Sequence, residues 1–243
     1  MTLRLDILPA ADWADRVAAD LAARLRDEPG TRLCLPTGDT PAPVYARLAA
    51  LARAGGAPFG AAVIVALDEY LGLPPGHPAR CDVRLARELL ALLPGPPAAF
   101  HRIEADDPVP AAAAARIDAI AAGGLDLAVL GLGMNGHVGL NEPGSYADAP
   151  TRVVRTSGAS RRAAVERYGA EPAPTAGITL GVARLLQARE IWLVVTGERK
   201  ASILARALEA PEGPDCPATW LRRHPTLRVI ADDAAAARLS ARV

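Results

Sequence analysis

The chain has 243 residues, of which 51% are hydrophobic and 22% are charged, a composition typical of a folded globular protein. Lys plus Arg balances Asp plus Glu at 27 each, so no overall basic charge favours nucleic acid or an anionic membrane. The longest apolar runs are strand-sized, and the charged residues after Met1 do not fit a signal peptide. We therefore expect a cytoplasmic protein with no nucleic-acid or membrane partner.

The cysteines give little support to a disulfide framework or a structural zinc site. Cys34, Cys81 and Cys216 are odd in number, far apart and show no C-x-x-C spacing. Three reduced thiols in the cytoplasm are the expected state.

Strand-like apolar runs alternate with helical patterns along the chain. In chain order we expect a helix over 11–26, a strand over 31–35, a helix over 41–54, a strand over 61–67, a helix over 82–93, a strand over 100–103 and a helix over 111–122. A strand over 125–130, a long polar loop, a helix over 178–186, a strand over 190–196, a helix over 200–208 and a strand over 227–230 follow. This alternation predicts an α/β, Rossmann-like fold with one doubly wound, mostly parallel sheet and helices on both faces. No repeat or linker divides it, so we expect a single domain over 1–243.

Four polar segments directly follow predicted strands, where ligands bind in such sheets. In the first, Gly38 and the start of the next helix can point N–H groups at an anion, and Thr37 and Thr40 add hydroxyls. Asp39 opposes phosphate binding there unless its side chain turns away. An ordinary turn is the alternative interpretation.

The second and fourth segments each carry a titratable group. A partly desolvated carboxylate such as Asp68 at a strand end can have a raised pKa and act as a general base. Alternatively, Asp68 and Glu69 cap the next segment or pair with arginines. Lys200, after Gly197, can neutralise a phosphate as a point charge or be a solvated helix residue.

The third segment contains the letters G-x-G-x-x-G at Gly131, Gly133 and Gly136. A dinucleotide site would require a helix to begin there, but the polar run 141–144 follows instead, and the motif lies mid-chain. We therefore reject a dinucleotide site.

The same segment places His137, Asn135 and Glu142 on one glycine-rich loop. A histidine exchanges protons near neutral pH, so this grouping favours a proton-transfer site over a merely hydrogen-bonded loop histidine.

Taken in order, these segments resemble the glucosamine-6-phosphate deaminase (isomerase) family from about residue 33 to residue 232. The resembling stretches are Leu35-Pro36-Thr37-Gly38-x-Thr40-Pro41, Asp68-Glu69-Tyr70-Leu71-Gly72-Leu73, Gly131 to Pro143, Leu180-Gly181-Val182 and Gly197-x-x-Lys200-Ala201. The sister 6-phosphogluconolactonases share the fold and the Gly-His element but characteristically lack the Asn-Glu-Pro ending.

The resemblance implies conversion of glucosamine 6-phosphate and water to fructose 6-phosphate and ammonia, with no metal and no organic cofactor. His137 would carry the proton during opening of the sugar ring, oriented by Glu142 and Asn135. Asp68 would then move a proton between C2 and C1 of the open chain.

The resemblance also implies a phosphate site and a wider substrate-binding set. Its members are Thr37, Gly38, Thr40, Glu69, Gly131, Gly133, Lys200 and an arginine, either Arg161 or Arg167, of which Arg167 is favoured.

The chain departs from the family at several positions. Asn135 stands where many members carry Asp, Asp39 replaces a small residue, and Cys81 lies in a region that is commonly Ser-Tyr. Val154 replaces a lysine of the regulatory cluster in allosteric members, so we expect no allosteric activation and a monomer or simple homo-oligomer. A lactonase, a deaminase of another hexosamine phosphate and a non-catalytic sugar-phosphate sensor remain alternatives.

Overall fold

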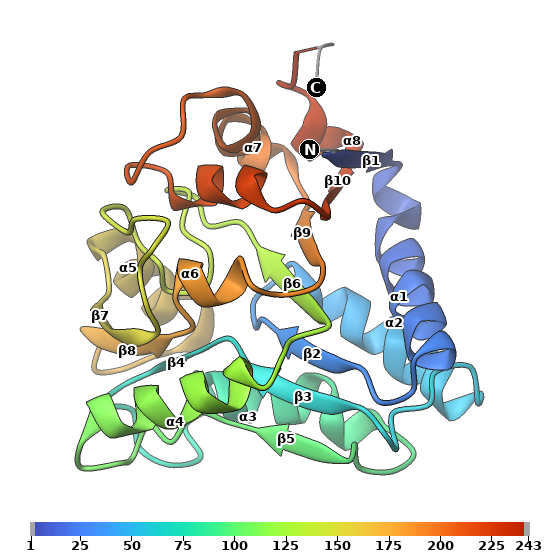
Figure 1. The fold of residues 1–243 in the computed structure, drawn as a ribbon, viewed down its shortest axis with the longest axis horizontal. Helices are drawn as coiled ribbons and strands as arrows, with labels where there is room; N and C mark the ends of the chain where they lie inside the picture. Colours follow the sequence, from blue (N-terminus) through green and yellow to red (C-terminus); the bar gives the residue numbers. More distant parts are fainter. Residues whose placement is uncertain (1–2, 241–243) are drawn as a thin grey trace.

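A seven-stranded sheet runs through the computed structural model, which describes residues 3–240. Its strands lie in the order β1, β10, β9, β6, β2, β3, β5, and every neighbouring pair is parallel (Figure 1). Their bounds are β1 Arg4–Leu8, β2 Arg32–Leu35, β3 Val63–Ala66, β5 Ala99–His101, β6 Leu127–Gly131, β9 Ile191–Val195 and β10 Leu227–Asp232.

Successive side chains of the central strands enter two different hydrophobic cores. In β6, Leu127 and Val129 pack in one core, whereas Ala128 and Leu130 pack in the other. Because neighbouring side chains of a strand point to opposite faces, both faces of the sheet must be covered. The unbroken apolarity of the strand reflects this double burial.

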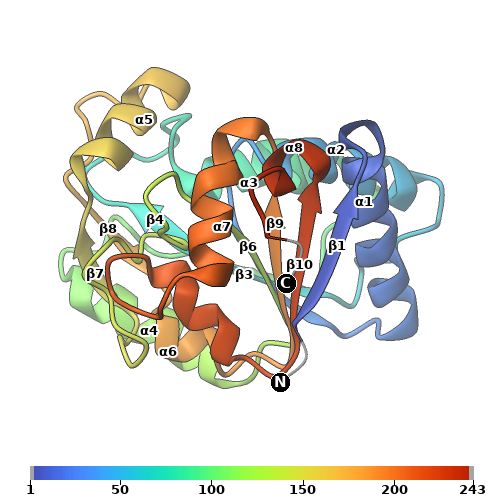
Figure 2. The same ribbon diagram turned by 90° about the horizontal axis from the view of Figure 1, so that it is seen from above.

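Helices supply that cover on both faces. The first core includes residues of α1 (Ala10–Asp27), α2 (Pro41–Arg53) and α3 (Cys81–Glu88). The second includes residues of α4 (Pro110–Ala122), α6 (Val182–Leu185), α7 (Ala201–Glu209) and α8 (Asp233–Ala236). Figure 2 shows α1 and α7 on opposite sides of the sheet. The predicted doubly wound, mostly parallel α/β fold is confirmed.

The direction of winding reverses between β2 and β6. From β2 the chain proceeds to β3 and β5, then returns to the other side of β2 and continues through β6, β9 and β10. Open α/β sheets bind ligands at such a reversal, beyond the carboxyl ends of the strands. Here β9, β6, β2 and β3 are adjacent, and the four polar segments follow these four strands.

A small second sheet was not predicted. It is antiparallel, in the order β4 (Asp68–Tyr70), β8 (Ala176–Thr179), β7 (Arg152–Arg155), and α5 (Gly158–Tyr168) joins β7 to β8. The predicted helix over 178–186 is wrong at its start, because Ile178 lies in β8 and only α6 is helical. Pairing with β4, which lies far earlier in the chain, overrides the local pattern.

The sequence also did not identify β1, whose neighbour in the sheet is β10 at the other end of the chain. Three short 3₁₀ segments complete the elements of residues 3–240, namely η1 Leu90–Leu92, η2 Glu198–Lys200 and η3 Pro217–Arg223. The predicted helix over 82–93 is thus divided into α3 and η1.

Glu69 joins β4 to the start of α3. Its Oε1 accepts hydrogen bonds from the backbone N–H groups of Tyr70 (2.8 Å) and Cys81 (2.9 Å), and its Oε2 accepts one from Asp82 (2.8 Å). The first N–H groups of a helix have no partner within the helix, so this carboxylate satisfies two of them. Glu69 is only 1% exposed.

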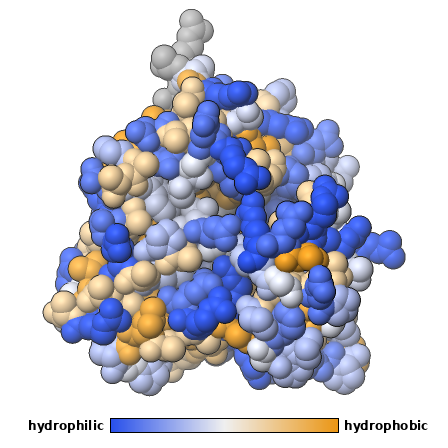
Figure 3. Space-filling model, turned by 180° about the vertical axis from the view of Figure 1, so that it is seen from behind, coloured by the Kyte–Doolittle hydropathy of each residue, from blue (hydrophilic) through white to orange (hydrophobic). Residues whose placement is uncertain are grey.

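The surface carries no extended apolar band on the face drawn in Figure 3, where hydrophobic residues are scattered among hydrophilic ones. Across residues 3–240, no helix has the length and apolarity needed to cross a lipid bilayer.

Replacing Glu69 with alanine should lower the free energy of unfolding by about 2–4 kcal/mol, because buried N–H groups would lose their acceptor. Urea denaturation followed by circular dichroism measures the change. Glu212→Ala is the control, since Glu212 makes an exposed ion pair with Arg223, and such pairs contribute little. Equal effects of the two substitutions would contradict the structural role of Glu69.

Candidate active site

A cavity of about 660 Å³ opens beyond the carboxyl ends of β9, β6, β2 and β3, and residues of α5 also line it. Ten of the twelve predicted site residues line this cavity: Thr37, Gly38, Thr40, Asp68, Gly131, Gly133, Asn135, His137, Arg167 and Lys200. Segments far apart in the sequence are therefore brought to one place by the strand order.

Glu142 lies behind the cavity wall and contacts His137. Its Oε2 is 3.4 Å from the His137 Nδ1, which is buried and has no other partner among the described residues. Oε2 also accepts a hydrogen bond from the Asn135 Nδ2 (2.8 Å). Burial alone would raise the pKa of Glu142, but His137, Ser160 and Asn135 lower it to about 2. The carboxylate is therefore charged and can stabilise a protonated His137.

Asn135 orients the loop rather than the imidazole ring. Its Oδ1 accepts a hydrogen bond from the backbone N–H of His137 (3.2 Å), while its amide nitrogen donates to Glu142. Asn135 therefore acts on His137 through the backbone and through Glu142, not through a hydrogen bond to the ring.

The absence of a side chain at Gly133 leaves room for the His137 ring. A Cβ atom at Gly133 would lie 2.3 Å from the ring's Cδ2 and Nε2, far inside contact distance. The backbone N–H of Gly133 also donates to the His137 carbonyl (2.9 Å). The close approach of ring and backbone requires glycine at this position.

Asp68 is half-buried in the cavity wall. Burial raises its pKa to about 6, although the nearby charges of His137 and Arg84 oppose the rise. A carboxylate of this kind is ionised at neutral pH yet basic enough to accept a proton from carbon.

A second group of residues offers an anion site. Gly38 has a φ of 138°, a conformation that favours glycine, and with Thr37 and Thr40 it leads into the 13-residue helix α2. Lys200 lines the same cavity, and its Nζ donates a hydrogen bond to the Leu132 carbonyl. Helix N-terminal N–H groups, hydroxyls and an ammonium group are a suitable combination for binding phosphate.

The charge of Lys200 is costly when no anion is bound. Burial lowers its pKa to about 8, and the neighbouring charges of Arg167 and Arg199 act in the same direction. A bound anion would counteract both effects, since an opposite charge close to Lys200 favours its charged form.

The structure corrects the role expected of Glu69 and separates the two candidate arginines. Glu69 does not line the cavity, because its carboxylate is occupied by the backbone N–H groups around the start of α3. In this structure Glu69 therefore stabilises the start of α3 and does not face the cavity. Arg167 lines the cavity, whereas Arg161 lies outside the wall and donates to the Thr156 carbonyl (2.8 Å).

Arg84 and Tyr168 also line the cavity, although neither was a predicted site residue. The Arg84 guanidinium lies 3.8 Å from the centroid of the Tyr168 ring, and its Nε donates to Glu88 (3.1 Å). Arg84 belongs to the middle of α3 and follows no strand, so no local sequence signal marks it. Only the packing of α3 beside β4 brings it to the cavity.

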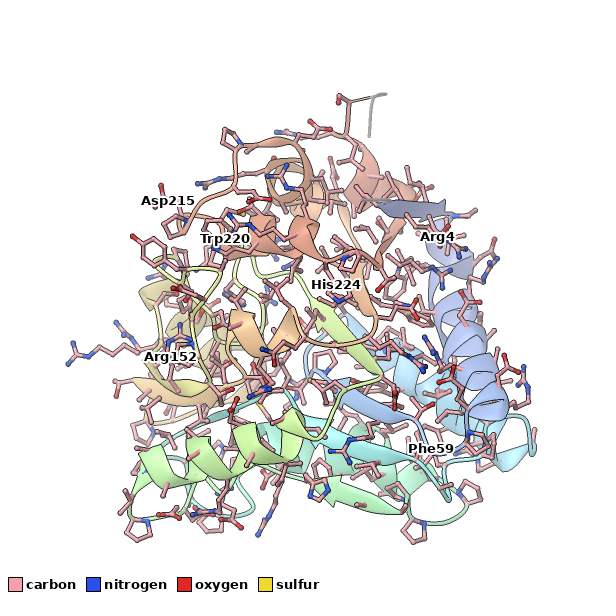
Figure 4. All side chains as sticks on the ribbon, viewed as in Figure 1. Arg4, Phe59, Arg152, Asp215, Trp220 and His224 are labelled. Atoms are coloured by element: carbon pink, nitrogen blue, oxygen red, sulfur yellow. The ribbon has the colours of Figure 1, made fainter. Side chains whose placement is uncertain are left out.

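Of the four histidines in the chain, only His137 is among the residues lining this cavity. His224, labelled in Figure 4, is buried with its Nε2 2.7 Å from the Ala188 carbonyl, which is a structural contact. Within residues 3–240, no three His, Cys, Asp or Glu side chains are grouped to hold a metal ion.

Comparison with known proteins places the chain among sugar-phosphate enzymes. A family model described as glucosamine-6-phosphate isomerases/6-phosphogluconolactonase matches residues 9–230. The glucosamine-6-phosphate deaminase of Rhodopirellula baltica is 35% identical, over 99% of this chain and 97% of that protein. The corresponding deaminase of Streptomyces avermitilis is 39% identical, over 96% of this chain and 91% of that protein.

Solved structures agree with this placement. A monomeric glucosamine-6-phosphate deaminase superposes with a TM-score of 0.91 at 26% identity, covering 97% of this chain and all of that one. The 6-phosphogluconolactonase of Thermotoga maritima superposes with a TM-score of 0.75 at 20% identity, covering 96% of this chain and all of its own, which shows a shared fold. On the family match and on the near-full-length identity to the deaminases, this chain belongs to the glucosamine-6-phosphate isomerase/6-phosphogluconolactonase family.

Proposed function

We propose that the protein is a glucosamine-6-phosphate deaminase, which converts glucosamine 6-phosphate and water to fructose 6-phosphate and ammonia. The observation that carries the proposal is one cavity lined both by two proton-transfer groups, Asp68 and His137, and by an anion site. The relatives named glucosamine-6-phosphate deaminase, 35% and 39% identical over nearly the whole chain, support it.

Ring opening is assigned to His137. The step moves a proton from the hydroxyl on C1 to the ring oxygen as the bond between C1 and that oxygen breaks. An imidazole can exchange this proton near neutral pH. Glu142, held charged, stabilises the imidazolium that forms in passing and keeps the ring in one orientation.

Asp68 is assigned the transfer between carbons. It takes the proton from C2 of the open-chain amino sugar while the C1 carbonyl oxygen gains a proton, which gives an enolamine. It then delivers the proton to C1 as the nitrogen loses one of its own protons and forms a C=N bond at C2. Water then adds to C2 and ammonia leaves, giving the ketose. A single base suffices because C1 and C2 are neighbouring atoms, provided that the substrate is held in place.

Binding of the phosphate group would hold the substrate in place. Thr37, Gly38, Thr40, Arg167 and Lys200 would bind it, and Gly131 and Gly133 would let the sugar approach the backbone. Binding energy from a part of the substrate that does not react can fix the geometry of the part that does.

Two finer assignments belong to the same proposal. We assign the protein to the cytoplasm, which agrees with its three buried, unpaired cysteines. We also propose that it acts as a single-domain monomer or a simple homo-oligomer, as the structural relative described as monomeric supports.

Asp68→Asn should reduce kcat for glucosamine 6-phosphate about 100- to 10,000-fold, because an amide cannot accept the proton from C2. Ammonia and fructose 6-phosphate are both measured, and binding of the substrate is followed separately by calorimetry. Full activity in this variant would refute the choice of base. A wild-type protein that binds glucosamine 6-phosphate but releases no ammonia would refute the deaminase and favour a sensor.

The pH dependence should be bell-shaped in kcat/KM. Activity falls below a pH of about 6, where Asp68 gains a proton, and above about 8, where Lys200 loses one and the anion site weakens. Initial rates measured on both sides of this range give the profile. In Lys200→Arg the alkaline decline should move to higher pH, because a guanidinium keeps its proton. An alkaline decline that stays in place in this variant would exclude Lys200 as its origin.

Gly133→Ala should lower kcat about 100-fold, since the methyl group would push the His137 ring from its position. Thermal unfolding of the variant checks that the fold is retained. The matched control is Gly60→Ala, because a Cβ atom at Gly60 would meet no atom within 4 Å. A Gly133→Ala enzyme as active as the control would contradict the requirement for this close approach.

A further inference from the structure

Asp39 lies within the predicted phosphate loop, between Gly38 and Thr40, and contacts the end of α5. Its Oδ2 is 3.2 Å from Nη1 of Arg167, and its Oδ1 accepts a hydrogen bond from the Tyr168 hydroxyl (3.2 Å). Both partners line the cavity. A carboxylate thus contacts the arginine that the proposed function assigns to the phosphate.

The Asp39 carboxylate lies near three cationic side chains, those of Arg167, Arg199 and Lys200. Arg167 and Arg199 both disfavour the charge on Lys200, whereas Asp39 favours it. In the absence of a bound anion, Asp39 therefore offsets repulsion among cations on one side of the cavity. With a bound phosphate, the same carboxylate would be a like charge beside the ligand.

Helix α5 packs only lightly against the rest of the protein. Of its eleven residues, only Ser160 and Ala164 are buried, and Figure 2 shows the helix at the edge of the molecule. At its amino end, Ser157 and Ser160 donate to Glu142. At its carboxyl end, Arg167 and Tyr168 contact Asp39. A carboxylate from another part of the chain therefore holds each end of α5.

We infer that Asp39 is an internal counter-anion that occupies Arg167 and holds the carboxyl end of α5 when no anion is bound, and that phosphate displaces it. Asp39 and the phosphate cannot share Arg167 without like-charge repulsion, so the exchange lowers the affinity for the ligand. This inference rests on the phosphate site of the proposed function. It adds a residue that sets phosphate affinity by competing for the site rather than by binding the ligand.

The test is the binding of inorganic phosphate to wild type and to Asp39→Asn, measured by calorimetry at low ionic strength. The substitution keeps the size of the side chain but removes its charge, so phosphate should bind about three- to tenfold more tightly. Because phosphate binds more tightly to the variant, saturating phosphate should raise the Tm of Asp39→Asn by more than it raises the Tm of wild type. Unchanged or weaker phosphate binding by Asp39→Asn, or no binding by either protein, would overturn the inference.

Asp15→Asn is the matched control. Asp15 also makes an exposed ion pair with an arginine, Arg47, at 2.7 Å, and neither residue lines the cavity. This control makes the same change in net charge and should leave phosphate affinity unchanged. If it tightens binding as much as Asp39→Asn, the effect is one of overall charge and the inference is wrong. In an Arg167→Gln background, the effect of Asp39→Asn should shrink, because the contested cation is gone.

The inference and the proposed deaminase fail in different ways. If Asp39→Asn binds phosphate more tightly but neither protein releases ammonia from glucosamine 6-phosphate, the counter-anion stands and the deaminase is refuted. If wild type releases ammonia but the substitution leaves phosphate affinity unchanged, the deaminase stands and the counter-anion is refuted.

Discussion

The cavity exists because four parallel strands, β9, β6, β2 and β3, are neighbours and therefore end at the same edge of one sheet. Each strand is followed directly by a polar segment, so chain direction and strand order together determine which side chains meet. Because the winding reverses between β2 and β6, no connection runs directly from one of these strands to the other. The space between the two loops that follow them is therefore not crossed by the chain. In a different strand order, the segments that carry Thr37, Asp68, His137 and Lys200 would end at separate places along the sheet.

Glu142 joins the loop that carries His137 to the start of α5. One of its carboxylate oxygens faces His137 and Asn135, and the other accepts from Ser157 and Ser160 at the start of α5. Glu142, which does not itself line the cavity, thereby holds both the His137 imidazole and the start of α5, whose residues line the cavity. Residues that hold catalytic groups in place in this way are as necessary to the geometry as the groups themselves.

Burial acts on the two sides of the cavity in opposite directions but with the same origin. It disfavours charge, so it raises the pKa of Asp68 to about 6 and lowers that of Lys200 to about 8. The first shift leaves a base suited to accepting a proton from carbon. The second leaves a cation that gains most from a bound anion. Both ionised forms are favoured together between these values, which is the range in which the proposed reaction requires them.

The sequence by itself determined the parallel α/β architecture, because apolar strands, helical periodicity and polar strand ends are local properties. It also located ten of the residues that line the cavity, since Thr37, Asp68, His137 and Lys200, among others, each follow a recognisable strand. It did not identify the second sheet, because the pairing of Ile178 with Glu69 joins distant segments and leaves no local pattern. Only the tertiary structure decided that Glu69 caps α3, that Arg84 reaches the cavity and that Asp39 holds Arg167. Each of these depends on which elements pack together, and a side chain's partners are settled by that packing rather than by its neighbours in the chain.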